Sequence, residues 1–151
     1  MNLQDELKAL KERIAELEEQ AKEEQEFPEY GDDYLFLLSG GTIDDNFYTN
    51  SHVDNHRQAI GNIFRNEDEA EFAVEKLKVE AELRKFSRPF ELNSFDYYIF
   101  FDTEKDCLGV GSLSYCRYQG TIYFESEEKA QEAVSTVGEE RIKKYIFGAE
   151  D

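Results

Sequence analysis

The chain is organised by the stretch FRNEDEAEFAVEKL, residues 64–77, which returns 60 residues later as FESEEKAQEAVSTV, residues 124–137. Each copy opens with an aromatic residue, passes through acidic side chains that suit the positive end of a helix dipole, and continues in a helical apolar pattern. An aromatic and apolar run stands upstream of each copy, YLFLL at 34–38 and YYIFF at 97–101. The pattern predicts one strand-then-helix unit that is used twice.

The fold class predicted from this repeat is α+β. We expect an N-terminal coiled-coil helix over residues 1–26, followed by an α+β domain over 27–151. The domain would consist of two similar strand-strand-helix units, at about 32–89 and 93–147, which form a mostly antiparallel sheet covered by helices.

The second unit has the clearer element boundaries. An aromatic strand is expected over 95–102, followed by a turn region around Gly109 and Gly111 and a further strand over 113–117, because glycines are typical of turns. A short final helix is expected over 139–147.

The first 26 residues carry a heptad pattern, with apolar residues alternately four and three positions apart. The candidate dimerisation residues are Leu3, Leu7, Leu10, Ile14 and Leu17. In a parallel dimer Glu6 would face Lys11 of the second copy, and Arg13 would face Glu18, so that both pairs attract. We therefore expect a homodimer through this helix. The alternative is a single amphipathic helix that folds against its own domain.

The charge of the chain restricts its partners. With 35 acidic and 17 basic residues, the formal net charge is -18. Such a field repels nucleic acid and membrane surfaces and attracts basic proteins, and no Lys/Arg cluster offers phosphate contacts. We expect a basic protein partner, no direct nucleic-acid binding, no membrane association and a cytoplasmic location. The alternative is that the acidic surface serves solubility alone.

The sequence contains no catalytic constellation. His52 and His56 have the four-residue spacing of a helical metal site, but a general-base Glu and a third ligand are missing. Cys107 and Cys116 have neither a zinc-ligand spacing nor a neighbouring histidine, so free structural thiols are expected. We therefore predict no enzyme activity, no metal site and no cofactor.

An acidic stripe on the first repeat helix is the remaining candidate site. Its members are Glu67, Asp68, Glu71, Glu75 and Glu82. Carboxylates one helical turn apart repeat at about 5.4 Å, a scale comparable to the phosphate repeat of a nucleic-acid strand. Such a row can occupy a cationic groove meant for DNA. The alternative is an ordinary solvated helix face, interrupted by Lys78 and Lys85.

Three segments carry a resemblance to known proteins: LQDELKALKERIAELEEQ at 3–20, GNIFRNEDEAEFAVEKLKVEAELRKF at 61–86 and GTIYFESEEKAQEAVSTVGEERIKKYIFG at 120–148. They resemble a recurring module of small acidic proteins encoded by phages and prophages of Gram-positive bacteria. The resemblance implies a mobile-element protein in the cytoplasm of the bacterial host, and small phage proteins of this kind include anti-CRISPR inhibitors.

The expected function is therefore that of a phage-type anti-defence protein. It would be an anti-CRISPR inhibitor that binds a Cas9-like nuclease with its guide RNA stoichiometrically through the acidic surface and blocks DNA binding. The alternative is a non-enzymatic dimeric adaptor or structural phage protein whose acidic surface is only solubilising.

Overall fold

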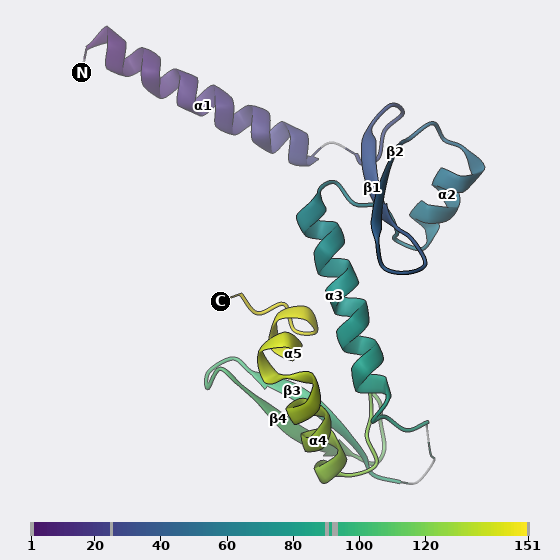
Figure 1. Cartoon of the computed structure of the whole chain (residues 1–151). Helices are drawn as coiled ribbons and strands as arrows, with labels where there is room; N and C mark the ends of the chain where they lie inside the picture. The colour runs from purple at the N-terminus through teal and green to yellow at the C-terminus, as the bar shows by residue number, and fades with distance from the viewer. Residues whose placement is uncertain (1, 25, 90, 92–93, 151) are drawn as a thin grey trace. The chain divides into compact units, whose positions relative to one another are not determined.

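The computed structural model describes residues 2–24, 26–89, 91 and 94–150. The chain divides into two compact units, Met1–Asn66 and Glu67–Asp151. The helices and strands of the described residues are labelled in Figure 1. In chain order they are α1 (Leu3–Glu24), β1 (Asp33–Leu37), β2 (Ile43–Phe47), α2 (His52–Ala59), α3 (Glu67–Arg84), β3 (Asp96–Asp102), β4 (Cys107–Leu113), α4 (Glu127–Val137) and α5 (Glu139–Tyr145).

The fold is a mixed α+β fold with an N-terminal helix and antiparallel strands. The described strands form two separate two-stranded sheets, β1–β2 in the first unit and β3–β4 in the second, rather than one continuous sheet. Helix α1 begins and ends two residues inside the predicted 1–26 segment. Helix α5 lies within the predicted final helix, 139–147.

In the first unit, strand β1 has neighbours along both of its edges. One edge pairs with β2, in a register that runs from Asp33 opposite Phe47 to Leu37 opposite Ile43. The other edge meets Phe64, whose backbone exchanges two hydrogen bonds of 2.9 Å with Leu35. The Asn62 side chain extends this pairing, since its amide accepts a hydrogen bond from the Leu37 N–H at 2.7 Å and donates one to the Leu37 carbonyl at 3.0 Å.

The second unit has its core on one face of the β3–β4 sheet. Helix α4 contacts both strands of this sheet, and α3, α4 and α5 contact one another (Figure 1). The buried cluster between them consists of Val79, Leu83, Phe124, Ala130, Ala133, Val137 and Ile142. Like the bridge of Leu35 with Phe64, a second isolated bridge lies just ahead of a helix: Phe124, before α4, exchanges backbone hydrogen bonds of 2.8 and 3.0 Å with Tyr97.

The predicted turn at Gly109 and Gly111 is wrong, because both glycines lie inside strand β4. They pair directly with Phe100 and Tyr98 of β3, whose rings lie over them. A Cβ atom added at Gly111 would come within 2.6 Å of the Tyr98 ring. The glycines therefore make room for cross-strand aromatic rings, an arrangement that protects a strand glycine. The predicted strand 113–117 shares only Leu113, the last residue of β4, with the observed strand. The hairpin turn lies earlier, at residues 103–106.

Polar contacts hold α5 against this hairpin. The Lys143 ammonium, in a residue that is 8% exposed, donates a hydrogen bond of 2.7 Å to the backbone carbonyl of Asp106 in the turn. Glu139, at the start of α5, accepts a hydrogen bond of 3.3 Å from the Leu108 N–H. The first and second turns of α5 are thus fixed relative to β3 and β4, which positions the apolar side of α5 over the core.

Candidate binding sites

The heptad residues of α1 are exposed. Their exposed fractions range from 47% at Leu17 to 83% at Leu3. On the same helix Arg13 forms an ion pair of 3.2 Å with Glu16, which stays within the chain. A row of five large apolar side chains left in solvent along one helix is typical of a helix that pairs with a partner.

The acidic stripe of α3 is divided by the structure. Glu67, Asp68 and Glu71 are exposed in the first turns of the helix, where carboxylates also stabilise the positive end of the helix dipole. Glu75 forms an ion pair of 3.1 Å with Lys78, one turn further along the stripe.

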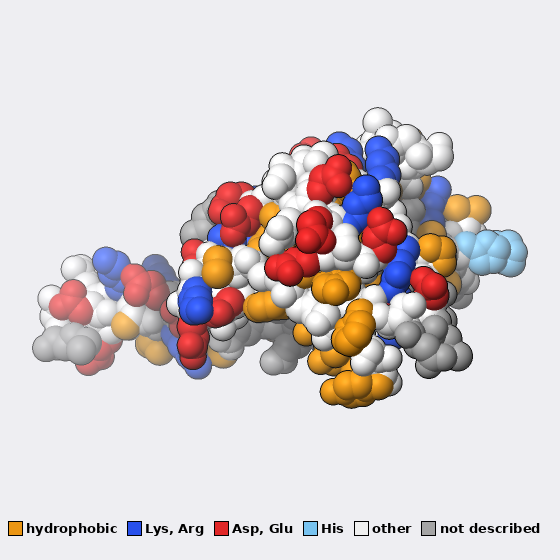
Figure 2. All heavy atoms as spheres, turned by 90° about the horizontal axis from the view of Figure 1, so that it is seen from below, with side chains coloured by type: hydrophobic (Ala, Val, Ile, Leu, Met, Phe, Trp, Pro, Cys, Tyr) orange, Lys and Arg blue, Asp and Glu red, His pale blue; other side chains and the backbone are white. Residues whose placement is uncertain are grey.

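Glu82, at the other end of the stripe, is engaged inside the second unit. It accepts a hydrogen bond of 2.6 Å from Arg141 of α5, and this bond raises the pKa of the Arg141 guanidinium above its ordinary value. On the face of the molecule shown in Figure 2, red carboxylate side chains are interspersed with blue Lys and Arg side chains. The stripe therefore presents a short acidic patch rather than an unbroken row.

A buried polar cluster in the first unit joins α2 to β1 and was not predicted from the sequence. Asp54 is 1% exposed and accepts hydrogen bonds from the Tyr34 hydroxyl, the Thr49 N–H at 2.9 Å and the Ser51 N–H at 3.2 Å. The Tyr34 hydroxyl itself accepts a hydrogen bond of 2.9 Å from Arg57. The hydrogen bond from Tyr34 is the main reason why the pKa of Asp54 lies well below its ordinary value.

This cluster is an anchor rather than an acid–base site. The carboxylate is held ionised, and burial raises the pKa of the Tyr34 hydroxyl, so neither group is poised to exchange protons near neutral pH. Asp54 also completes a capping box with Ser51, the N-cap of α2. A local signal for this role was available in the sequence, because Ser followed three residues later by an acidic residue favours a helix start.

The histidines and cysteines lie where no ligand set forms around them in the described part of the chain. His52 and His56 are exposed on α2 with their ring centroids 4.2 Å apart. Cys107 is half-buried in β4 and Cys116 is exposed, and both are free thiols. Among the described residues, no group of three or more His, Cys, Asp or Glu side chains could hold a metal ion.

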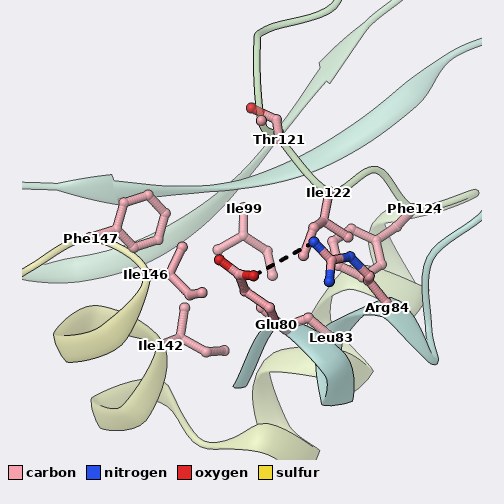
Figure 3. A pocket seen from close by; sticks show the side chains of 11 residues that line it. Glu80, Leu83, Arg84, Ile99, Thr121, Ile122, Phe124, Ile142, Ile146 and Phe147 are labelled. Carbon is pink, nitrogen blue, oxygen red and sulfur yellow. Dashed lines mark ion pairs between the residues drawn. The ribbon is translucent and has the colours of Figure 1, made fainter. Parts of the chain in front are cut away.

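A pocket of about 240 Å³ opens in the second unit (Figure 3). Its walls come from α3, from β3, from the segment before α4 and from the end of α5. The apolar lining consists of Leu83, Ile99, Ile122, Phe124, Ile142, Ile146 and Phe147. No sequence pattern predicts this pocket, because its walls are brought together from four separate stretches of the chain.

Two opposite charges on α3 also line the pocket. A carboxylate oxygen of Glu80 lies 3.6 Å from a guanidinium nitrogen of Arg84, one helical turn away. The Glu80 side chain is 24% exposed and that of Arg84 is 61% exposed. In Figure 3 the Glu80 side chain reaches from α3 toward the isoleucines, and the dashed line joins it to Arg84. The pocket therefore combines an apolar lining with one largely covered carboxylate.

Comparison with known proteins gives no family for this chain. No protein-family profile, no characterised protein and no solved structure matches it. None of the described helices is long and apolar enough to cross a membrane. The features of the chain that bear on function are the exposed helix seam, the acidic patch and the pocket.

Proposed function

We propose that this chain is a non-catalytic binding protein that forms a homodimer through α1 and captures a basic protein stoichiometrically. The observation that carries the proposal is the exposed heptad seam of α1, with at least 47% of each of its five apolar residues in solvent. A second copy of the same helix is the occupant that fits, because the flanking charges are complementary: Glu6 attracts Lys11 of the partner copy, and Arg13 attracts Glu18.

The dimer is tested by sedimentation equilibrium of the full chain. We expect a monomer–dimer equilibrium that Leu10→Glu shifts to monomer. Leu10 occupies heptad position d, where a carboxylate would be buried in the seam. Ala15→Glu adds the same charge at the outward b position of the same helix and is the matched control. A wild-type chain that stays monomeric at about 100 μM, or an equal effect of the two variants, would contradict the dimer.

The specific form of the proposal is a phage-type anti-defence protein that inhibits a Cas9-like nuclease in the host cytoplasm. It is supported by the net charge of -18, by the exposed carboxylates Glu67, Asp68 and Glu71, and by the resemblance of the repeats to phage proteins. Charge attraction of this kind speeds association and weakens as salt rises.

A pull-down with guide-loaded Cas9 at low and high salt tests this form. We expect capture at low salt that is lost at high salt and competed by target DNA. Replacing Glu67, Glu71 and Glu75 together by Lys should abolish capture while the circular dichroism spectrum stays unchanged. Capture that survives this triple replacement would exclude DNA mimicry by the stripe.

A second candidate is a dimeric adaptor that docks another phage protein and uses its charge only for solubility. It is favoured by the ion pairs of Glu75 with Lys78 and of Glu82 with Arg141, which engage two of the five stripe carboxylates within the chain. Capture of a partner that is insensitive to salt would favour the adaptor over the mimic.

We also infer that the two halves of the repeat are copies of one strand-strand-helix unit. The inference is supported by the matching bridges, Leu35 with Phe64 and Tyr97 with Phe124, each of which stands just ahead of an acidic helix start. In both copies a residue of the first strand exchanges two backbone hydrogen bonds with the phenylalanine that opens the repeat, which is Phe64 in the first copy and Phe124, 60 residues later, in the second.

A further inference from the structure

We propose that the pocket of the second unit receives a phenylalanine-sized side chain of the basic partner, while a Lys or Arg next to that side chain pairs with Glu80. The inference rests on the proposed function for the statement that the occupant belongs to a protein. Beyond the proposed function, it specifies where the partner binds and which of the partner's side chains the pocket selects. The acidic stripe and the α1 seam take no part in it.

The size of the pocket sets the size of the occupant. An engineered cavity of about 150 Å³ lined by Leu, Ile and Phe binds benzene and stays free of water. The pocket described above has a similar lining and a volume of about 240 Å³, so one six-membered ring fits with its methylene link. Apolar anchors that fill such pockets supply most of the binding energy in protein interfaces, while surrounding charges supply less.

Of the two charged groups at the pocket, Glu80 is the more covered and selects the charge of the occupant. The Glu80 side chain is three-quarters covered, yet its ion pair with Arg84 is long, at 3.6 Å, and Arg84 is mostly in solvent. An incoming cation would therefore compete for Glu80 with a distant and solvated guanidinium rather than with a close, buried one. An incoming carboxylate would meet Glu80 in a poorly solvated position, where like charges are costly.

The overall field of the chain favours the same occupant. A net charge of -18 raises the local concentration of basic segments at any surface of the molecule. This attraction alone does not distinguish one basic segment from another. The pocket distinguishes basic segments from one another, because only a segment with an apolar side chain of the right size fills it.

The test uses the full chain with ¹³C-labelled isoleucine δ1 methyl groups. Four of the eight isoleucines, Ile99, Ile122, Ile142 and Ile146, line the pocket, and Ile14, Ile43 and Ile60 of the first unit serve as internal controls. The probes are the capped peptides acetyl-Lys-Phe-Lys-amide, acetyl-Lys-Ala-Lys-amide and acetyl-Glu-Phe-Glu-amide.

We expect the Lys-Phe-Lys peptide to shift the four pocket methyl signals in a saturable way and to leave the three control signals in place. The Lys-Ala-Lys peptide, which has the same charge, should leave the pocket signals unmoved, and the Glu-Phe-Glu peptide should bind more weakly than Lys-Phe-Lys. Glu80→Gln keeps the shape of the side chain and should weaken Lys-Phe-Lys binding about two- to fivefold, as expected for a partly exposed ion pair. Glu132→Gln removes a carboxylate of α4 that forms a comparable ion pair of 3.5 Å with Lys129 and lies outside the pocket lining; it is the matched control and should not change binding.

The inference is overturned if Lys-Phe-Lys and Lys-Ala-Lys give equal shifts, if the control methyl groups move as much as the pocket methyl groups, or if Glu80→Gln and Glu132→Gln have equal effects. Failure of the proposed function is seen separately. If the Cas9 pull-down captures nothing while the pocket signals respond, the site stands and the proposed partner is wrong. If a basic partner is captured while the pocket signals stay unmoved by Lys-Phe-Lys, the pocket inference alone falls.

Discussion

Replacing Asp54 by Asn tests the polar cluster that fixes α2 on β1. The substitution preserves the size of the side chain but removes its charge and turns one of its two acceptor oxygens into a donor. In the native chain one oxygen accepts from the Tyr34 hydroxyl and the other from the N–H groups of Thr49 and Ser51. An Asn that keeps its oxygen toward the Thr49 and Ser51 N–H groups turns its NH2 group toward Tyr34. The Tyr34 hydroxyl would then accept hydrogen bonds from both Asn and Arg57, and its own O–H would lose the acceptor that Asp54 provides.

The size of the effect follows from these contacts. A hydrogen bond to a charged group contributes roughly 1.5–3 kcal/mol, against about 0.5–1.5 kcal/mol for a neutral pair. Weakening three such bonds by about 1 kcal/mol each gives an expected loss of about 3 kcal/mol. A small domain is stabilised by only about 5–15 kcal/mol in total, so the loss should be plain in any unfolding curve.

Urea unfolding followed by amide NMR signals is the appropriate assay, because it resolves the two units. Signals of Phe36 and Phe64 in the first unit should disappear at lower urea in Asp54→Asn, while that of Val79 in the second unit should shift less. Asp44→Asn, which neutralises an exposed carboxylate of β2, is the matched control and should change stability by no more than about 0.5 kcal/mol. Equal curves for the two variants would refute the role assigned to Asp54.

The same substitution has a predictable pH dependence. The pKa of Asp54 is lowered in the folded chain by its hydrogen bonds, whereas an Asp in an unfolded chain titrates near 3.9. The stabilisation is therefore fully present above about pH 4 and is lost as the pH falls toward the folded-state pKa. The stability difference between wild type and Asp54→Asn should stay constant from pH 7 to about pH 5 and narrow below about pH 4. A difference that persists unchanged to about pH 2 would contradict the assignment of the charge to Asp54.

Two further substitutions test the second unit. In thermal melts, Gly111→Ala should lower the stability of the second unit by about 1–3 kcal/mol, because the new methyl group would lie 2.6 Å from the Tyr98 ring. Gly40→Ala is the control and should be near neutral, because no atom lies within 4 Å of its new methyl group. Glu82→Gln should cost no more than about 1 kcal/mol, since both partners of its pair with Arg141 are more than a third exposed; a loss above about 2 kcal/mol would mean that this pair holds α5 in place.

Local patterns in the sequence were sufficient to predict most of the helices. The heptad spacing placed α1, and the acidic residues followed by a helical apolar pattern placed α4. The N-cap of α4 is Ser126, whose hydroxyl accepts a hydrogen bond of 3.1 Å from the Lys129 N–H. These signals lie within a few residues of the structure they specify, so no knowledge of the tertiary fold is required.

The errors arose where distant residues decide the structure. Gly109 and Gly111 are residues typical of a turn. They lie in strand β4 instead, where they pair with Phe100 and Tyr98 of β3. Glu82 looks like a solvated helix residue until Arg141, 59 positions later, is brought beside it. The pocket has the same origin, since its isoleucines come from β3, from the segment before α4 and from α5 and share no sequence pattern.

The exposed seam of α1 has a consequence for how strongly a partner is held. The helix has 22 residues and is therefore about 33 Å long at about 1.5 Å per residue. In a parallel pair both chains leave the coil at the same end, so every binding surface of the protein is presented twice from that end. A target that displays two copies of its basic segment would then be engaged by both arms at once, and the second contact would form at the high effective concentration set by the first. Such a target would be retained far longer than one with a single segment, although each individual contact is the same.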